Sequence, residues 1–501
     1  MGRKTAYPIV GGFDNLQTQG RDEETWNMYI VVPAEAQGGT ESLLMRGSSM
    51  EFQVTSSPTQ GEDPAYLINF PGDVQLFSFS KGIRSRGRAY QYEGNLYCVV
   101  SQFLFKVSKQ NNAVAVGTLN TDIGWVEIVG NNAGQLMVVD GATGYIYNTN
   151  TTIFTQITDP DFFPNPTTLA YLDGSFIVNS SGTNNWQLSA LNDGLSWPAQ
   201  RTAQMETQWD HIVAIRVNVG QVYLIGNLIT ETWADTGQPV FPYQRISTST
   251  FQTGTKAVGS CVQTEGMLFF LGNALVGTTS VYMSMGATPT KISTMAVDRE
   301  INAYLHPEDA KAFMFRENGH SFYQINFTLD DASWLYNITN NTWTKLKMSD
   351  GSRYVMEDIT NFNGVNYGRA YNDANMYRVS QDITNYHGLP ILKERIGPLI
   401  VSPTYSYLSM PYCEAFVSQG FAPETGNSDE PYLWMSISKD RGASFNSSIR
   451  KSMGKKGETG RRTYWHNPTG VSHNYVIRLQ NWDDIQFYIF SFVLILEQIG
   501  L

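Results

Sequence analysis

Apolar segments that follow short polar turns recur through the middle of the chain. The turns, such as Glu93-Gly94-Asn95 and Asp173-Gly174, carry Gly, Asn and Asp, and the segments after them are rich in apolar residues. Segments of this length, bounded by turn residues, are typical of strands that enter a sheet through a tight turn. Strands are predicted on this basis at Leu96–Val100, Leu136–Asp140, Ser175–Asn179, Val222–Gly226, Met267–Leu271, Ser321–Phe327 and Gly364–Tyr367.

The spacing of these turns is nearly regular. Their first residues lie near 93, 131, 172, 218, 264, 317 and 361, at intervals of roughly 38 to 53 residues. This interval is typical of the blades of a β-propeller. Many units also close with a short aromatic strand, for example GYIYN at 144–148 and ETWAD at 231–235. The pattern therefore predicts an all-β fold with a propeller of about seven blades over residues 60–394, because a sandwich pair or a jelly roll would not repeat in this way.

The two flanks of the repeat differ from it. Residues 1–59 are irregular apart from TWNMYIVV at Thr25–Val32, and they predict an extended N-terminal arm. Residues 395–501 again have the pattern of strands and predict a C-terminal β-sandwich-like domain. Helix signals are weak, and His306–Arg316 is predicted to form one short turn before a strand. The boundary of the C-terminal domain is marked by Pro398, Pro403 and Pro411.

The composition agrees with an all-β fold and narrows the function. Only 16% of the residues are charged, against roughly 25% in a typical globular domain, while 13% are aromatic. The net charge of −11 argues against broad nucleic-acid binding, which usually needs a basic surface. The same net charge does not exclude a conduit whose wall must repel DNA.

Three features of the sequence indicate where the chain is made. Cys98, Cys261 and Cys413 are far apart, and we expect buried free thiols in a reducing compartment. The N-terminus has no apolar core of signal-peptide length. The apolar segment Phe487–Leu496 is too short for a membrane-spanning helix and is predicted to be a final buried strand. We therefore expect synthesis in a cytoplasm and no membrane anchor.

The stretch SISKDRGASF at Ser436–Phe445 resembles the Asp box, a turn that recurs in sialidases and other propeller enzymes. In such a turn the aspartate accepts backbone N–H bonds, the glycine takes a positive φ, and the aromatic residue packs beneath. A sialidase-like site would also need clustered arginines and a tyrosine nucleophile, and the scattered arginines of this chain cannot be assigned to one. We therefore predict a structural turn formed by Ser438, Asp440, Gly442 and Phe445.

No motif of the sequence predicts a cofactor or a metal ion. The six histidines lack metal-binding spacing, and neither a P-loop nor a G-x-S-x-G elbow occurs. The glycine-rich stretch Gly454–Arg462 precedes a strand rather than a helix, so a hairpin tip is predicted instead of a phosphate cradle.

The most basic part of the chain surrounds this predicted hairpin. Three interpretations stay open for it: contact with an acidic partner surface, contact with DNA phosphates, or exposure to solvent alone. The same alternatives hold for a second, smaller basic stretch at Gly82–Tyr90. The cations of the basic hairpin are Arg450, Lys451, Lys455, Lys456, Arg461 and Arg462.

Several of these segments together resemble the tail-hub proteins of short-tailed phages, also called packaged-DNA stabilisation proteins. The resemblance is carried by NMY at Asn27–Tyr29, by VYLIGNLITETWADTG at Val222–Gly237 and by the segment from Phe269 to Ile301. It is most specific near the C-terminus, where LWMSISKDRGASF, KSMGKKGETGRRTYW and YVIRL follow one another. The stretch LLMRGSSM at Leu43–Met50 is similar to an early family segment but lacks its proline and its second glycine.

The resemblance implies a structural virion protein rather than an enzyme. Members of this family form a ring, usually a homohexamer, below the portal and its adaptor protein in the tail. The ring extends the channel for packaged DNA, helps to retain that DNA, and anchors the needle or plug and the receptor-binding fibres or tailspikes. We expect ring contacts through the arm and the C-terminal domain. The alternatives are a glycan-binding or glycan-cleaving tail-tip protein and a cellular propeller scaffold.

Overall fold

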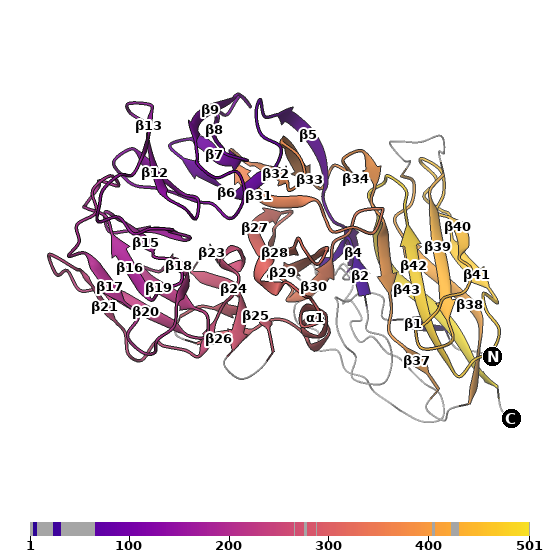
Figure 1. The fold of residues 1–501 in the computed structure, drawn as a ribbon. Coiled ribbons are helices and arrows are strands. Elements are labelled where there is room, and N and C mark those ends of the chain that lie inside the picture. Colours follow the sequence, from indigo (N-terminus) through magenta and orange to yellow (C-terminus); the bar gives the residue numbers. More distant parts are fainter. Residues whose placement is uncertain are drawn as a thin grey trace.

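Two bodies lie side by side in the computed structural model, a β-propeller and a β-sandwich (Figure 1). The structure describes residues 4–7, 24–31, 66–264, 266–274, 278–286, 288–402, 406–421 and 430–499. Strands dominate both bodies, and the described residues contain a single α-helix, α1 (Met295–Ile301).

The propeller has seven sheets arranged around one axis, as the sequence predicts. In the first four blades the strands follow one another in sequence from the inner to the outer edge. These blades are β6 (Ser85–Tyr92), β7 (Asn95–Val100), β8 (Phe103–Val107) and β9 (Ala113–Thr118); β10 (Glu127–Gly130), β11 (Gln135–Val139), β12 (Gly144–Asn148) and β13 (Ile153–Gln156); β14 (Leu169–Leu172), β15 (Ser175–Asn179), β16 (Asn185–Leu188) and β17 (Thr202–Gln204); β18 (Ile212–Asn218), β19 (Gln221–Gly226), β20 (Thr230–Asp235) and β21 (Tyr243–Arg245).

Among the last three blades, the fifth and the seventh depart from this simple order. The fifth has two short inner strands, the sixth is regular, and the seventh takes its outer strand β5 from the start of the propeller. They are β22 (Thr253–Gly254), β23 (Val262–Thr264), β24 (Met267–Ala274), β25 (Ser280–Ser284) and β26 (Pro289–Lys291); β27 (Lys311–Glu317), β28 (His320–Phe327), β29 (Ala332–Asn337) and β30 (Thr342–Lys345); β31 (Met356–Phe362), β32 (Val365–Ala370), β33 (Asn375–Ser380) and β5 (Gly72–Ser78).

The seven predicted apolar strands correspond to the second strand of each blade, β7, β11, β15, β19, β24, β28 and β32. These strands are buried on both faces because neighbouring blades pack against them, and their apolar runs reflect this burial. The turns before them allow the tight reversal. Glu93 and Gly94 have φ of 47° and 70°, and Asp173 and Gly174 have φ of 48° and 82°, as a two-residue hairpin turn of type I′ requires.

The sandwich consists of two packed sheets. One has the order β3 (Met28–Val31), β4 (Tyr66–Asn69), β43 (Tyr488–Ile499), β38 (Tyr407–Val417) and β41 (Thr463–His466), with β1 (Lys4–Tyr7) also on β43. The other has the order β2 (Glu24–Trp26), β36 (Lys393–Ile396), β42 (Asn474–Asn481), β39 (Tyr432–Ser438) and β40 (Ile449–Ser452), with β37 (Ile400–Val401) also on β42. A small hairpin of β34 (Asn385–Tyr386) and β35 (Leu389–Pro390) lies between the bodies.

The described residues of the predicted N-terminal arm are strands of the sandwich. β1, β2 and β3 each pair with strands from later in the chain, so residues 24–31 are distributed between the two sheets. Asn27, which separates β2 from β3, has a φ of 54° and turns the backbone from one sheet to the other. The family-like stretch Leu43–Met50 lies outside the described residues.

Two local predictions about helices had different outcomes. Pro307–Asp309 forms a 3-10 turn directly before β27, as predicted for His306–Arg316. Helix α1 was missed, although Thr294 is a favourable N-cap residue whose side chain accepts a hydrogen bond from Val297 N. Seven residues are too few for a clear helical periodicity in the sequence. The predicted final strand Phe487–Leu496 corresponds to β43.

Candidate functional site

The axis of the propeller is the first place to examine for a site, because loops and inner strands of all the blades meet there. Two hollows of about 360 and about 440 Å³ open along it. Trp125 lines both hollows and thus lies between them. The residues around Trp125 therefore decide whether the axis is an open channel.

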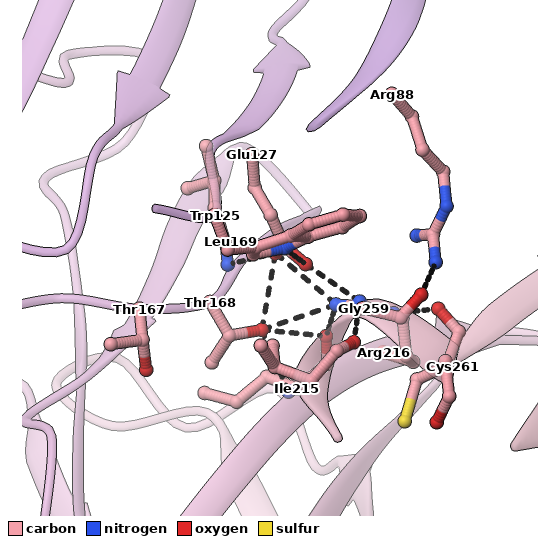
Figure 2. Close-up of polar contacts among 12 residues, drawn as sticks. Arg88, Trp125, Glu127, Thr167, Thr168, Leu169, Ile215, Arg216, Gly259 and Cys261 are labelled. Atoms are coloured by element: carbon pink, nitrogen blue, oxygen red, sulfur yellow. Dashed lines mark hydrogen bonds and ion pairs between the residues drawn. The ribbon is translucent and has the colours of Figure 1, made fainter. Parts of the chain in front are cut away.

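A buried ion pair between Glu127 and Arg216 joins four blades near this point (Figure 2). Arg216 Nη2 lies 2.6 Å from Glu127 Oε1, and Glu127 Oε2 accepts the Leu169 backbone N–H at 2.7 Å. Arg216 Nε also donates to the Cys261 carbonyl at 2.9 Å. Burial disfavours the charged guanidinium, but the Glu127 carboxylate outweighs this effect and raises the pKa of Arg216. Arg216 therefore stays protonated, and its contacts with those of Glu127 fix blades two to five to one another.

Arg88 crosses the axis from the first blade to the fifth and sixth. Its guanidinium donates to the carbonyls of Gly259 at 2.5 Å and Ala312 at 2.7 Å, and it lies 5.1 Å from the centroid of the Trp125 ring. Burial, and then repulsion from Arg216, lowers its pKa to about 10, which leaves it protonated at neutral pH. Figure 2 shows Arg88 and Arg216 on opposite sides of the Gly259 backbone.

Two further ion pairs help to connect the seventh blade to its neighbours, one within the blade and one between blades. Arg369 Nη2 lies 2.8 Å from Asp358 Oδ2 and also donates to the Gly87 carbonyl of the first blade. Lys311 of the sixth blade lies 2.5 Å from Glu357 of the seventh. Burial alone would raise the pKa of Glu357, but Lys311 and Arg353 together lower it. We refer to Arg88, Arg216–Glu127, Arg369–Asp358 and Lys311–Glu357 as the axial pins.

The Arg369–Asp358 ion pair lies within the seventh blade, whereas the other polar contacts named above join one blade to another. The arrangement therefore stabilises the ring of blades and fills its centre. Within the described residues, no group of three His, Cys, Asp or Glu side chains is placed to hold a metal ion. The chemistry of the axis is therefore that of a structural network.

The predicted basic stretch Gly82–Tyr90 is corrected by this geometry. Arg86 and Arg88 point into the propeller, where Arg86 donates to the carbonyls of Ser101, Thr121 and Gly124. Only Arg84 of the three arginines is exposed. Arg84 precedes β6, whereas Arg86 and Arg88 lie within it. The sequence does not show their burial, because the carbonyls that they bind lie elsewhere in the chain, for Arg88 in the fifth and sixth blades.

The predicted structural turn has the geometry of a self-capped loop. Ser438 Oγ donates to Asp440 Oδ1 at 2.6 Å, and Asp440 Oδ1 accepts the Ser444 N–H at 2.9 Å. These hydrogen bonds lower the pKa of Asp440 to about 2. Gly442 has a φ of 88°, and the Phe445 ring lies 4.3 Å from the Arg478 guanidinium carbon. The Asp440 carboxylate is occupied by its own turn.

The predicted basic hairpin is not a hairpin. β40 pairs with β39 in one sheet of the sandwich, whereas β41 pairs with β38 in the other. The stretch between them therefore crosses from sheet to sheet. Met453, which is fully buried in the sandwich core, anchors the start of this crossing, and Trp465 anchors its end. The glycine and polar residues of this stretch suggest a local hairpin. The strands at its two ends instead pair in different sheets, because Met453 and Trp465 are buried in the core between them.

The six predicted cations stay together at one edge of the sandwich and are all exposed. Arg450 lies 4.8 Å from the Tyr432 ring, and Lys451 lies 5.9 Å from the Tyr464 ring. Arg462 Nε lies 2.7 Å from Glu414 Oε1, and this ion pair raises the pKa of Arg462. Lys455 and Lys456 occupy the exposed loop, and Arg461 lies 3.6 Å from Glu458. The structure thus confines the basic stretch to a surface that also carries aromatic side chains.

The thiols and the apolar segments are structural. Cys98, Cys261 and Cys413 are free and buried, and burial raises the pKa of the Cys98 thiol to about 11 and that of Cys413 to about 12. Among the helices in the described part of the chain, none has the length and hydropathy to cross a bilayer.

Solved structures with similar folds have very different sequences. A virginiamycin B lyase from Staphylococcus aureus is 10% identical, with a TM-score of 0.43 over 62% of this chain and 99% of its own. The extracellular domain of a putative hybrid two component system from B. thetaiotaomicron is 11% identical, with a TM-score of 0.43 over 79% of this chain and 47% of its own. The N-terminal domain of Nup159 is 9% identical, with a TM-score of 0.37 over 62% and 95%.

Comparison with known sequences and families identifies the family of the chain. No curated protein sequence matches the chain significantly. A family model described as "Bacteriophage P22 Gp10, beta-propeller" matches residues 52–384, which is about two thirds of the chain and includes all seven blades. The family resemblance inferred from the motifs is thereby confirmed. The chain belongs to the phage stabilisation family of bacteriophage P22 Gp10, whose members are built on a β-propeller.

Proposed function

We propose that the chain is a tail-hub subunit of a short-tailed phage. Six copies form a ring below the portal and its adaptor protein, continue the channel for packaged DNA and help to retain that DNA. The ring also holds the needle or plug and the receptor-binding fibres or tailspikes. The proposal is supported by membership of the phage stabilisation family and does not require an enzymatic activity.

The observation that carries the proposal is the closed propeller axis. Arg88 and Trp125 lie across the axis, and the Glu127–Arg216 pair is fixed beside them. A DNA duplex cannot pass through a centre that is filled by hydrogen-bonded side chains. If the chain contributes to a DNA channel, that channel must lie between subunits, and an oligomer is therefore required.

The charge distribution supports the same proposal. Residues 66–392, which contain the propeller, have 26 acidic and 19 basic residues, a net charge of −7. A wall with this charge repels phosphates, so DNA slides along it instead of adhering. Residues 393–499 have 10 acidic and 11 basic residues, a net charge of +1. The excess of acidic over basic residues thus lies in the propeller and not in the sandwich.

Deletion of the gene tests the proposal. Phage grown on a complementing host and then passed once through a non-complementing host should fill their heads and lose the DNA afterwards. The measurement is the fraction of full heads by electron microscopy, together with the fraction of DNA that resists nuclease, over time after lysis. Complementation with the wild-type chain is the control and should restore both values.

Another outcome would contradict the proposal. Heads that stay full but fail to adsorb to cells would indicate a receptor-binding or glycan-binding role at the tail tip. Adsorption is measured by the loss of free phage after mixing with host cells, so the two outcomes can be separated in one set of particles.

A further inference from the structure

The outer face of one sandwich sheet carries an unusual set of side chains. In an antiparallel sheet with one face on the core, the other face normally meets water and is polar. In β38, β41 and β43 the core face is formed by residues such as Cys413, Trp465 and Phe492. The opposite face is rich in aromatic side chains. We call this surface the aromatic face and define it by Tyr412, Phe416, Tyr464, His466 and Phe490.

The aromatic face is exposed in the single chain. Phe416 is 46% exposed, and Tyr464 and Phe490 are each 38% exposed. Three aromatic side chains with this exposure on one sheet are a candidate contact surface, because tyrosine, phenylalanine and arginine are enriched where proteins bind one another. β38 and β41 are the strands of this sheet that lie farthest from the propeller (Figure 1). Phe490 lies nearer to it, because its ring is 5.7 Å from that of Tyr66, which packs against the core between propeller and sandwich.

The side chains of the aromatic face are held in place before any partner binds. The rings of Tyr412 and Tyr464 stack with centroids 6.0 Å apart, and the His466 ring lies 5.1 Å from Tyr464. Arg462 donates to Glu414 at 2.7 Å and to the Tyr412 hydroxyl at 2.8 Å. Groups that are already ordered lose little conformational entropy on binding, and this favours affinity.

A basic rim borders the aromatic face. It consists of the exposed loop between β40 and β41 and of the residues next to it. Arg462 lies 5.8 Å from the Tyr464 ring, and Lys451 lies 5.9 Å from the same ring. The remaining cations of the rim are Lys455, Lys456 and Arg461. Arg462 and Arg461 are paired with Glu414 and Glu458, so the three lysines are the cations of the rim that favour an acidic partner.

The propeller of a second copy is the acidic partner that the chain itself supplies. Residues 66–392 have a net charge of −7, with exposed carboxylates such as Asp161, Glu206 and Asp235. Burial and the nearby Asp235 carboxylate raise the pKa of Asp173, so this part of the surface gains from a neighbouring cation. Two aromatic faces would bring their basic rims together and repel one another.

We propose that the aromatic face with its basic rim docks against the acidic propeller of a second copy of this chain. This inference rests on the proposed assembly into a hub and deepens it by naming the contact surface. The two surfaces of such a contact are different, so the contact is heterologous. Repetition of a heterologous contact generates a closed ring when the rotation closes, as a hub requires.

Photo-cross-linking in assembled particles tests the proposal directly. A photoreactive phenylalanine analogue is placed at Phe416, an exposed position, and phage are grown on cells that supply this chain. After irradiation of purified particles, mass spectrometry identifies the cross-linked peptides. We expect peptides from residues 66–392 of another copy. Cross-links to the aromatic face of another copy, to a different virion protein alone, or to none would overturn the proposal. The analogue at Phe490 repeats the test should the first position reduce incorporation.

Charge reversal in the rim provides the second test. The double variant Lys455→Glu, Lys456→Glu should lower the number of copies of this chain per phage particle at least fivefold. The matched double variant in the propeller, Lys109→Glu with Lys256→Glu, should leave this number near the wild-type value. Normal incorporation of the rim variant, with DNA retained, would refute the contact surface and leave the hub function intact. Loss of binding to a fluorescent oligonucleotide by the rim variant, with normal incorporation, would assign the rim to DNA instead.

The same particles separate failure of the contact surface from failure of the hub proposal. The hub proposal fails only if particles without any copies of this chain keep their DNA. The contact surface fails if the cross-links or the copy number depart from the expectation while those particles still lose their DNA.

Discussion

Trp26 and Lys345 are direct partners across a parallel strand pair, and through them the sixth blade of the propeller continues into the sandwich. On its other side Trp26 is paired with Glu394 of β36 in an antiparallel ladder. Blade and sandwich therefore share one sheet of ten strands in which β2 is the connecting strand. The three-residue strand β2 thus connects the propeller to the sandwich, which the sequence predicts as separate domains.

Asn27, the next residue, strengthens this connection. Its Nδ2 donates to the carbonyls of Lys347 and Leu392, both at 2.8 Å, and its Oδ1 accepts the Lys347 N–H at 2.9 Å. Met28 then enters the sandwich core, while Tyr29 enters a core formed by the last two blades and the junction. Three consecutive residues, Asn27, Met28 and Tyr29, therefore contact both bodies.

The Asn27→Ala variant should lower the free energy of unfolding by roughly 3 kcal/mol, because three buried hydrogen bonds are lost and their partners stay buried. Chemical denaturation followed by tryptophan fluorescence measures this change. The sandwich should also unfold at a lower denaturant concentration than the propeller. Asn95→Ala, in an exposed turn, is the matched control and should change little. A single transition at the wild-type midpoint would show that Asn27 does not couple the bodies.

The Glu127→Gln variant should lower the stability of the propeller by about 3 to 5 kcal/mol, because the buried Arg216 loses its ionised partner. Replacement of both residues, in Glu127→Met with Arg216→Met, should recover a large part of this loss, since no buried charge then remains unpaired. Thermal and chemical unfolding of the single and double variants measure the coupling. Equal losses in the single and double variants would argue against a specific role for the ion pair.

Asp73 should make the closure of the propeller dependent on pH. It lies on β5, the strand that completes the seventh blade, and its Oδ1 accepts the His387 N–H at 2.9 Å. Burial raises its pKa from 3.8 to about 7. The folded chain therefore binds the proton more tightly than the unfolded chain. The stability that comes from this proton is complete below about pH 4 and is lost as the pH rises towards 7.

The Asp73→Asn variant should remove this dependence. Relative to the wild type, the variant should gain roughly 3 kcal/mol in the free energy of unfolding between pH 4 and pH 7. Denaturation at a series of pH values measures the difference. His387 is also affected, since burial lowers its pKa, so Asp382→Asn on the same blade serves as the matched control. Parallel pH profiles of the wild type and Asp73→Asn would refute the assignment.

The accuracy of the sequence predictions depended on the distance between the interacting residues. The turn Asp173-Gly174 and the strand after it were predictable because both depend on neighbouring residues, and seven such units imply a propeller. The Glu127–Arg216 pair was not predictable, since 89 residues separate its members. The basic stretch was assigned to a hairpin for the same reason: its local signals are those of a turn, whereas β40 and β41 find their partners in different sheets.

The last prediction concerns the turn that resembles an Asp box. Asp440→Ala should lower the thermal midpoint of the sandwich slightly, because Ser438 and Ser444 lose the acceptor that organises the turn. The same variant should leave the retention of DNA in particles unchanged, since the Asp440 carboxylate is committed to its own loop. Differential scanning calorimetry and the nuclease-resistance assay measure the two effects, with Asp193→Ala as a control, because Asp193 Oδ1 also accepts a backbone N–H two residues on, that of Leu195, in a propeller loop. Loss of adsorption by Asp440→Ala with normal stability would instead indicate that this turn contacts a ligand, and would favour the glycan-binding alternative over the hub.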